Sequence, residues 1–277
     1  MKKIIISAAL TGAITSKHEA PALPITSDEI IRDAVVCAKA GAAIVHIHVR
    51  DEQGQGSMEL ARFREVYHGL KKALDEEGLD LLINLTTSGA VGVGDEERMA
   101  HIKELKPDLC SYDVGSLNWL HSTVFLNPPH FLEALGACTQ EHNVKPEIEI
   151  FDGGMVENAI YYLKKGVLKA PPFFQIVLGA AGGLSGTPEN LMFLRNKLPE
   201  GSLFSVSGIG KAHLPMMFAA LSMGADGIRV GLEDNVFLSK HVPATNVQLV
   251  ERAVAAVKLA GYEISTAREA REILELK

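Results

Sequence analysis

The chain has 277 residues, of which 47% are hydrophobic, and its formal net charge at pH 7 is −7. This length suits a single domain over residues 1–277 and matches an α/β barrel, which typically has about 250 residues. The negative charge argues against nucleic acid as the main partner, because phosphate binding needs a basic face. No apolar run is long enough to span a bilayer, so we expect no membrane partner.

The cysteines and the N-terminus indicate a cytoplasmic protein. Cys37, Cys110 and Cys138 are far apart and odd in number, which favours reduced thiols over a disulfide framework or a thiolate metal site. Met1–Ile6 looks like the start of a signal peptide. However, the apolar run soon reaches Thr11 and lacks a clean cleavage site, so it predicts a first strand.

Eight short apolar runs alternate with helix-like segments along the chain. The predicted strands are Lys3–Leu10, Ala42–Val49, Leu79–Thr86, Leu109–Val114, Glu147–Asp152, Phe173–Gly179, Leu203–Ser207 and Gly227–Leu232. This alternation predicts parallel strands with right-handed crossovers. Eight such units without a linker favour a closed (β/α)₈ TIM barrel, and a doubly wound parallel sheet is the alternative.

Start and stop signals delimit several helices between these strands. The predicted helices begin at Ser27 and end at Gly41, begin at Asp95 and end before Pro107, begin at Thr187-Pro188, and cover Ala212–Met223 and Asn246–Ala260. Thr266 caps an extra C-terminal helix, Ala267–Leu276, which we expect to serve packing or subunit contact.

Two histidines in the second predicted strand are the first candidate site. His46 and His48 are two residues apart, so they share one face of a strand. Imidazole is a common Zn²⁺ ligand, and two on one strand leave positions for a third ligand and a substrate. A partly buried strand with two hydrogen-bonded histidines is the alternative.

Polar residues also follow other strands, at the end where barrel enzymes have their active sites. The third strand ends in Thr86, Thr87, Ser88 and Gly89, which suit a carboxylate but also suit an ordinary turn. The fourth strand offers Ser111, and the fifth places Glu147 and Glu149 on one face. Two buried carboxylates are costly unless they are paired or functional, so this pair favours function.

The last two predicted strands are also followed by candidate site residues. Ser207, Gly208, Gly210 and Lys211 precede a helix, where backbone N–H groups favour a phosphate; a tight glycine turn is the alternative. After the eighth strand, Glu233 or Asp234 can supply the oxygen ligand that the two histidines lack. Arg229 needs a carboxylate partner, and Asp234 is the nearest, although a structural ion pair would explain the same residues.

Taken together, these motifs resemble the β-keto acid cleavage enzymes over essentially the whole chain. The matching segments are Thr11–Ala13, Ala40–Ala42, His46–Arg50, Thr86–Gly92, Lys145–Asp152, Ser207–Gly210 and Arg229–Asn235. The resemblance implies a TIM barrel with one zinc ion per chain, usually a homotetramer. It also implies an acetyl-CoA-dependent acyl transfer that converts a β-keto acid to acetoacetate and a new CoA thioester.

The resemblance implies roles for individual residues. His46, His48 and Glu233 would bind the metal, and Arg229 and Asp234 would be the base-activating pair. Thr86, Thr87, Ser111 and one glutamate of the Glu147/Glu149 pair would contact the substrate. Family members that act on an amino-substituted keto acid have an acidic residue where this chain has Ile14, so we expect a more apolar substrate.

The residues are compatible with this chemistry on physical grounds. A bound metal would stabilise charge on the keto oxygen, the Thr86–Gly89 segment would hold the substrate carboxylate, and Ser207–Lys211 would bind CoA phosphates. Two alternatives stay open. One is a metal-dependent aldolase or lyase of the hydroxymethylglutaryl-CoA lyase type, which would need no acetyl-CoA. The other is a non-catalytic ligand-binding barrel.

Overall fold

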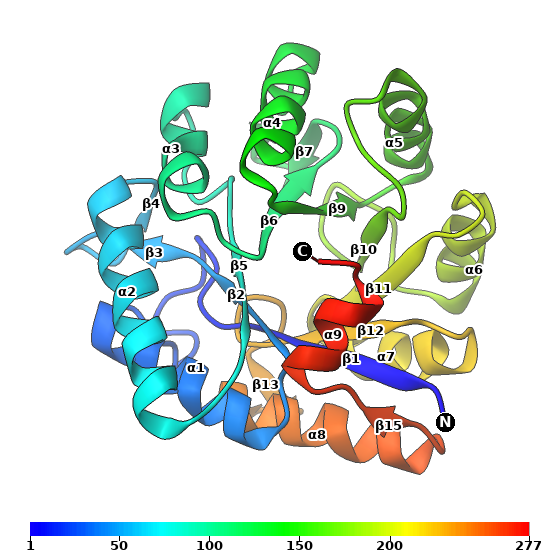
Figure 1. The fold of residues 1–277 in the computed structure, drawn as a ribbon. Helices are drawn as coiled ribbons and strands as arrows, with labels where there is room; N and C mark the ends of the chain where they lie inside the picture. The colour runs from blue at the N-terminus through cyan, green and yellow to red at the C-terminus, as the bar shows by residue number, and fades with distance from the viewer. Residues whose placement is uncertain (277) are drawn as a thin grey trace.

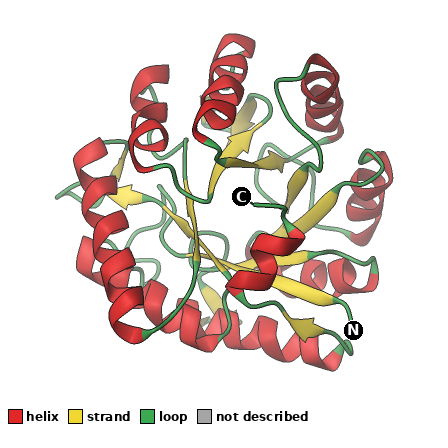
Figure 2. Ribbon diagram, in the orientation of Figure 1, coloured by secondary structure: helices red, strands yellow, loops and turns green. Residues whose placement is uncertain are grey.

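The computed structural model describes residues 1–276 and contains a closed barrel of parallel strands surrounded by helices (Figures 1 and 2). The barrel strands are β1 (Lys3–Ala9), β2 (Ile44–Ile47), β5 (Leu82–Leu85), β6 (Leu109–Asp113), β9 (Lys145–Ile150), β10 (Phe173–Leu178), β11 (Leu203–Gly208) and β12 (Gly227–Val230). β12 pairs with β1, with Ser7 opposite Arg229, and this pairing closes the sheet. The predicted TIM barrel is therefore confirmed over the doubly wound sheet.

The main helices follow the strands and cover the outside of the barrel. They are α1 (Ser27–Ala40), α2 (Leu60–Glu77), α3 (Asp95–Leu105), α4 (Pro129–His142), α5 (Gly153–Lys165), α6 (Pro188–Lys197), α7 (His213–Ser222) and α8 (Asn246–Leu259). The helices predicted at α1, α3, α6, α7 and α8 are confirmed within one or two residues. Among residues 1–276, no helix has both the length and the apolar character to cross a bilayer.

The second strand is shorter than predicted. β2 ends at Ile47, and the chain then forms β3 (Val49–Arg50), which pairs antiparallel with β4 (Gly56–Ser57). His48 therefore lies just outside the strand, not within it as the sequence predicted. Two other hairpins enlarge loops at the same mouth of the barrel: β7 (Leu117–Trp119) with β8 (Thr123–Phe125), and β13 (Phe237–Ser239) with β14 (Val242–Pro243).

The strand register arranges the interior side chains in layers, each contributed by alternate strands. Toward the C-terminal end, the layer of Ile44, Leu109, Phe173 and Gly227 is followed by Ser7, Asn84, Glu147 and Ser205, and then by His46, Ser111, Gln175 and Arg229. The interior thus changes from apolar to polar along the barrel axis. All three cysteines lie elsewhere, as buried thiols.

The predicted C-terminal helix is present as α9 (Ala267–Ile273), and it closes the N-terminal end of the barrel. Short β15 (Glu263–Ile264) pairs with the start of β1 and leads into this helix. Ala270 and Leu274 join a buried apolar cluster with Ile5, Leu82 and other residues of the lowest interior layers. In Figure 1 the red helix lies across the barrel opening. The helix therefore packs against the barrel interior, which is one of the two roles predicted for it.

Candidate active site

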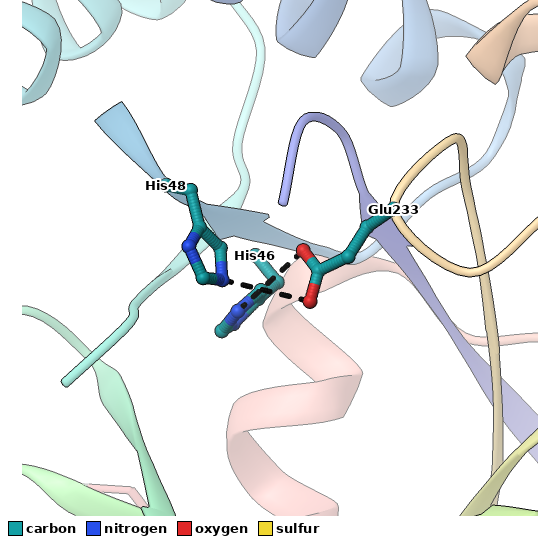
Figure 3. A group of neighbouring side chains, drawn as sticks. All are labelled: His46, His48 and Glu233. Atoms are coloured by element: carbon teal, nitrogen blue, oxygen red, sulfur yellow. Dashed lines mark ion pairs between the residues drawn. The ribbon is translucent and has the colours of Figure 1, made fainter. Parts of the chain in front are cut away.

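His46, His48 and Glu233 point toward one another at the C-terminal end of the barrel (Figure 3). His46 Nε2 lies 3.8 Å from Glu233 Oε2, and His48 Nε2 lies 3.5 Å from Glu233 Oε1. These separations are long for hydrogen bonds. They are close to the edge of a tetrahedron around one ion, about 3.3 Å for bonds of about 2.0–2.1 Å.

The protonation state of His46 suits a metal ligand. Burial lowers the pKa of His46 to about 3, although the Glu233 carboxylate and the Asn84 side chain both favour its protonated form. A neutral imidazole keeps a lone pair for a metal. Glu233 Oε2 is also buried without a hydrogen-bond partner among residues 1–276. The two imidazoles and the carboxylate therefore fit a divalent cation such as zinc.

Close backbone packing holds Glu233 in this place. Gly231 has φ 139° and passes so near the Ala9 carbonyl that a Cβ would lie 2.0 Å from its oxygen. On the other side, a Cβ at Gly12 would lie 2.8 Å from Glu233 Cγ. Arg50 fixes that loop, because its guanidinium donates to the carbonyl oxygens of Thr11, Gly12, Thr15 and Gly54.

Arg229 connects three carboxylates beside this group. Its guanidinium contacts Asp234 at 3.0 and 3.1 Å, Glu233 at 2.6 Å and Glu149 at 3.1 Å. Ser207 Oγ donates to Asp234 Oδ2 at 2.6 Å. Burial and the nearby Glu233 carboxylate raise the pKa of Asp234, whereas Arg229 and Ser207 act to lower it. The result is a buried carboxylate with raised basicity, oriented by two donors.

The two glutamates of β9 lie at different depths. Glu149 contacts Arg229, and burial together with Asp113 raises its pKa well above the usual value. Glu147 lies two residues nearer the N-terminal end of the same strand and accepts a hydrogen bond of 2.6 Å from Asn84 Nδ2. Burial raises the pKa of Glu147 to about 7. The barrel interior is rich in acidic groups, which makes it a favourable environment for a cation.

The turn after β5 uses most of its own hydrogen-bonding groups. Thr87 N–H donates to Ser111 Oγ at 3.0 Å, and Ser88 N–H donates to Thr86 Oγ1 at 3.1 Å. Gly89 N–H points to Met58 Sδ at 3.0 Å. The hydroxyls of Thr86 and Ser88, 3.2 Å apart, are therefore better placed to meet a ligand than the backbone amides are.

The loop after β11 has a part that supports Asp234 and a part that is exposed at the barrel mouth. Ser207 is used by Asp234, and Gly210 N–H donates to the Asp234 carbonyl at 3.0 Å. Gly208 packs so closely that a Cβ would lie 2.4 Å from the Ala212 carbonyl oxygen. Of the predicted phosphate-binding group, Gly210 and Lys211 are exposed, in the short 3₁₀ turn Gly210–Ala212 just before α7, and only Lys211 carries a charge. The loop therefore supports Asp234 and leaves one cation at the barrel mouth.

Comparison with known proteins identifies the family of the chain. Residues 3–276 match the sequence model of the beta-keto acid cleavage enzyme family. The chain belongs to this family. It is 41% identical to the 3-keto-5-aminohexanoate cleavage enzyme of Fusobacterium nucleatum, with 100% of this chain and 99% of that protein covered.

More distant relatives of this β-keto acid cleavage enzyme have other names. The 3-oxoadipate:acetyl-CoA acetyltransferase of Cupriavidus necator is 33% identical, with 98% of this chain and 94% of that protein covered. A solved structure of ObcA, in a ternary complex with a C4-CoA adduct and oxalate, superposes with a TM-score of 0.80. It is 22% identical and covers 92% of this chain and 68% of ObcA, so it supports the barrel fold alone.

Sequence reasoning missed several residues that support the site of this β-keto acid cleavage enzyme. Arg98 of α3 is buried and donates to the Thr87 carbonyl at 2.7 Å, and His101 contacts the Thr86 carbonyl at 2.7 Å. Asn84 links Glu147 to the region of His46. A signal for Asn84 was available, because it shares the inward face of its strand with Thr86, two residues later.

Proposed function

We propose that the protein catalyses acetyl-CoA-dependent cleavage of a β-keto acid, giving acetoacetate and a new acyl-CoA. The observation that carries this proposal is the His46–His48–Glu233 group directly beside the Arg229–Asp234 pair. Family membership and the acetyl-CoA transfer named for several relatives support it.

Asp234 is the proposed base that removes the proton from carbon 2 of the keto acid. Its raised pKa and its two supporting donors suit a carboxylate that takes and later returns a proton. The electron pair left on carbon 2 attacks the acetyl carbonyl of acetyl-CoA, and the CoA thiolate leaves. The thiolate then attacks the original keto carbon, the bond between carbons 2 and 3 breaks, and protonated Asp234 returns its proton to give acetoacetate.

The ion proposed for the His46–His48–Glu233 group is one Zn²⁺ per chain. The two imidazoles and one carboxylate are the ligand types of catalytic zinc sites that leave a position open. When bound, such an ion acts as a Lewis acid toward a substrate carbonyl. Arg229 contributes by holding the Glu233 and Asp234 carboxylates in fixed positions.

The substrate carboxylate is proposed to lie at the turn after β5. The hydroxyls of Thr86 and Ser88 would contact this carboxylate, while the hydrogen bonds of Thr87 with Ser111 and of Gly89 with Met58 hold the turn in shape. Of the two β9 glutamates, Glu149 is the one that accepts a hydrogen bond from Arg229, so we assign substrate contact to Glu149 rather than to Glu147.

The acyl part of the substrate is proposed to be uncharged and apolar. Ile14 occupies the position next to the Gly12-Ala13 turn, and its side chain is 56% exposed, so it offers apolar surface and no partner for an ammonium group. Lys211, with the N-terminal end of α7, is the proposed contact for CoA phosphates. The adjacent Ser207, Gly208 and Gly210 contribute by shaping this loop.

The deciding experiment is an assay with β-keto acids, with and without acetyl-CoA, in protein of known zinc content. We expect acetoacetate and acyl-CoA only when acetyl-CoA is present. Turnover without acetyl-CoA would favour the lyase, and ligand binding without turnover would favour the non-catalytic barrel. Asp234→Asn should lower turnover by about 10²–10⁴-fold with zinc content unchanged, while Asp75→Asn, on the exposed side of α2, should act as wild type.

Substrate preference is tested separately, by a panel of keto acids with apolar or amino-substituted chains. We expect wild type to prefer apolar chains and Ile14→Glu to shift preference toward the amino-substituted ones, because a carboxylate would pair with the ammonium group. An Ile14→Leu variant controls for side-chain size. An unchanged preference in Ile14→Glu would contradict this part of the proposal.

The assembly and location are also proposed from the family resemblance. We expect a homotetramer, measured by light scattering coupled to gel filtration, in the cytoplasm. The buried thiols of Cys37, Cys110 and Cys138 support a reducing compartment.

A further inference from the structure

The interior layer directly below the candidate metal group is polar, which is unusual for this fold. It consists of Ser7, Asn84, Glu147 and Ser205, from four alternate strands, and all four are essentially inaccessible to solvent. Barrel layers are generally filled by branched apolar side chains. Each of these residues also has a side-chain oxygen with no hydrogen-bond partner in the described part of the chain. This layer must therefore serve something other than packing.

Asn84 is the member of this layer that lies opposite a candidate ligand on the neighbouring strand. It pairs with His46 across the β2–β5 register, and both side chains point into the barrel. Its amide nitrogen is used, because Nδ2 donates to Glu147 Oε2 at 2.6 Å. Its oxygen, Oδ1, is buried and unpartnered within residues 1–276, and so is His46 Nδ1. The two unmatched atoms are an acceptor and a potential donor on neighbouring side chains.

These observations define how the His46 ring can be held. The Nε2 atom of His46 faces Glu233, so the opposite ring nitrogen, Nδ1, is the one left for a supporting hydrogen bond. A histidine that binds a metal through one nitrogen generally donates from the other to an oxygen of the protein, which fixes both the tautomer and the ring orientation. Asn84 Oδ1 is such an oxygen.

We propose that Asn84 is a positioning residue for the metal group, accepting a hydrogen bond from His46 Nδ1–H and so directing the Nε2 lone pair toward the ion. Glu147 fixes the direction of the Asn84 amide, because a carboxylate at 2.6 Å selects the amino end of the amide and turns the oxygen end away from itself. The inference rests on the metal site of the proposed function. It gives the deeper glutamate of β9 a role distinct from that of Glu149.

The test measures zinc affinity, by competition with a chromophoric chelator, and the visible spectrum of the Co²⁺-substituted protein. Asn84→Leu has a similar size but no acceptor, and we expect zinc affinity to fall by about 10–100-fold, with an altered Co²⁺ spectrum. Glu147→Gln should lower affinity by less, because a neutral oxygen still accepts from the Asn84 amide. Ser205→Ala, in the same layer but without a link to His46, is the matched control and should bind zinc as wild type does.

The outcomes separate this inference from the proposed function. If wild type binds no divalent ion, the metal part of the proposed function fails. If wild type binds zinc and folded Asn84→Leu binds it equally well, with an unchanged Co²⁺ spectrum, only the role of Asn84 is overturned. If Asn84→Leu does not fold, Glu147→Gln decides, because zinc affinity and a Co²⁺ spectrum equal to those of Ser205→Ala would contradict the proposal.

Discussion

The two halves of the barrel interior contain opposite kinds of side chain, apolar at the N-terminal end and polar at the C-terminal end. The N-terminal half contains Ile44, Leu109 and Phe173 and is sealed by α9 through Ala270 and Leu274. The C-terminal half contains ionisable and polar side chains at nearly every inward position. Each fully buried apolar side chain stabilises the fold by about 1.5–3 kcal/mol, whereas buried charges stabilise little and cost much if unpaired.

This difference assigns separate tasks to the two ends. The apolar end supplies stability through buried apolar side chains such as Ile44, Leu109 and Phe173. The polar end depends on a few contacts, above all those of Arg229, to keep several carboxylates together in a buried space. Substitutions at the apolar end should therefore change stability alone, and those at the polar end should change both stability and turnover.

The largest effect is expected from Arg229→Met. Removing the guanidinium leaves Glu149, Glu233 and Asp234 without their shared cation, and breaking a buried ion pair in this way costs about 3–5 kcal/mol. Turnover should be lost, because Asp234 also loses the guanidinium that orients it and keeps only the hydrogen bond from Ser207. Urea unfolding and the acetyl-CoA assay measure the two effects.

Arg229→Lys is the control for charge. It keeps a cation but lacks the planar fork that reaches three carboxylates, so we expect stability between those of wild type and Arg229→Met. If Arg229→Met were as stable as wild type, the ion network would not have the structural importance assigned to it.

The next effect is expected at the apolar end, from Leu274→Ala. Leu274 is fully buried against the lowest barrel layers, and truncation of such a leucine costs about 2–5 kcal/mol. Zinc content and turnover per folded molecule should stay at wild-type values. Leu259→Ala, at an 82% exposed position at the end of α8, should change stability by less than about 0.5 kcal/mol.

A pH-dependent effect is expected from His101, which supports the turn after β5 from outside the barrel. Burial lowers the pKa of His101 to about 4, from an ordinary value of 6.5. Between pH 4 and pH 6.5, His101 binds a proton in the unfolded chain but not in the folded chain. The contribution of His101 is therefore fully present above pH 6.5 and is lost as the pH falls toward 4.

His101→Gln isolates this contribution, because glutamine can still donate to the Thr86 carbonyl but does not titrate. We expect the variant to lose less stability than wild type between pH 6.5 and pH 4, with a difference of up to about 3 kcal/mol. Urea unfolding at several pH values measures it, and His18→Gln, at an exposed position, should follow wild type. Parallel curves for His101→Gln and wild type would refute the assignment.

The sequence predicted much of the fold because its signals are local. The helix at α1 is delimited by a capping box at Thr26 and by Gly41 with a left-handed conformation, and both signals can be read from neighbouring residues. His46, Glu233, Arg229 and Asp234 could also be placed, because a barrel brings the ends of all its strands to one mouth.

The remainder depended on tertiary contacts that no local pattern contains. Arg98 lies in the first turn of α3, next to three acidic residues. A charged side chain in such a segment is expected to be exposed to solvent. It is buried because loop carbonyls of Thr87 and Leu126 and the Asn127 side chain surround it. β2 likewise ends before His48, close to Arg50, whose guanidinium contacts a loop that is distant in the sequence.

The smallest effect, from Thr266→Ala, tests the independence of the two ends most strictly. Thr266 caps α9 through a capping box with Glu269, and loss of such a cap costs about 1 kcal/mol. Thr266→Ser keeps the hydroxyl and should be close to wild type in urea unfolding. Because the buried side chains of α9 pack against the apolar layers, away from the candidate metal group, zinc affinity and turnover should be the same in all three proteins. A fall in zinc affinity in Thr266→Ala alone would mean that the lower layers also hold His46 and Asn84 in place, and that the two halves of the barrel are coupled.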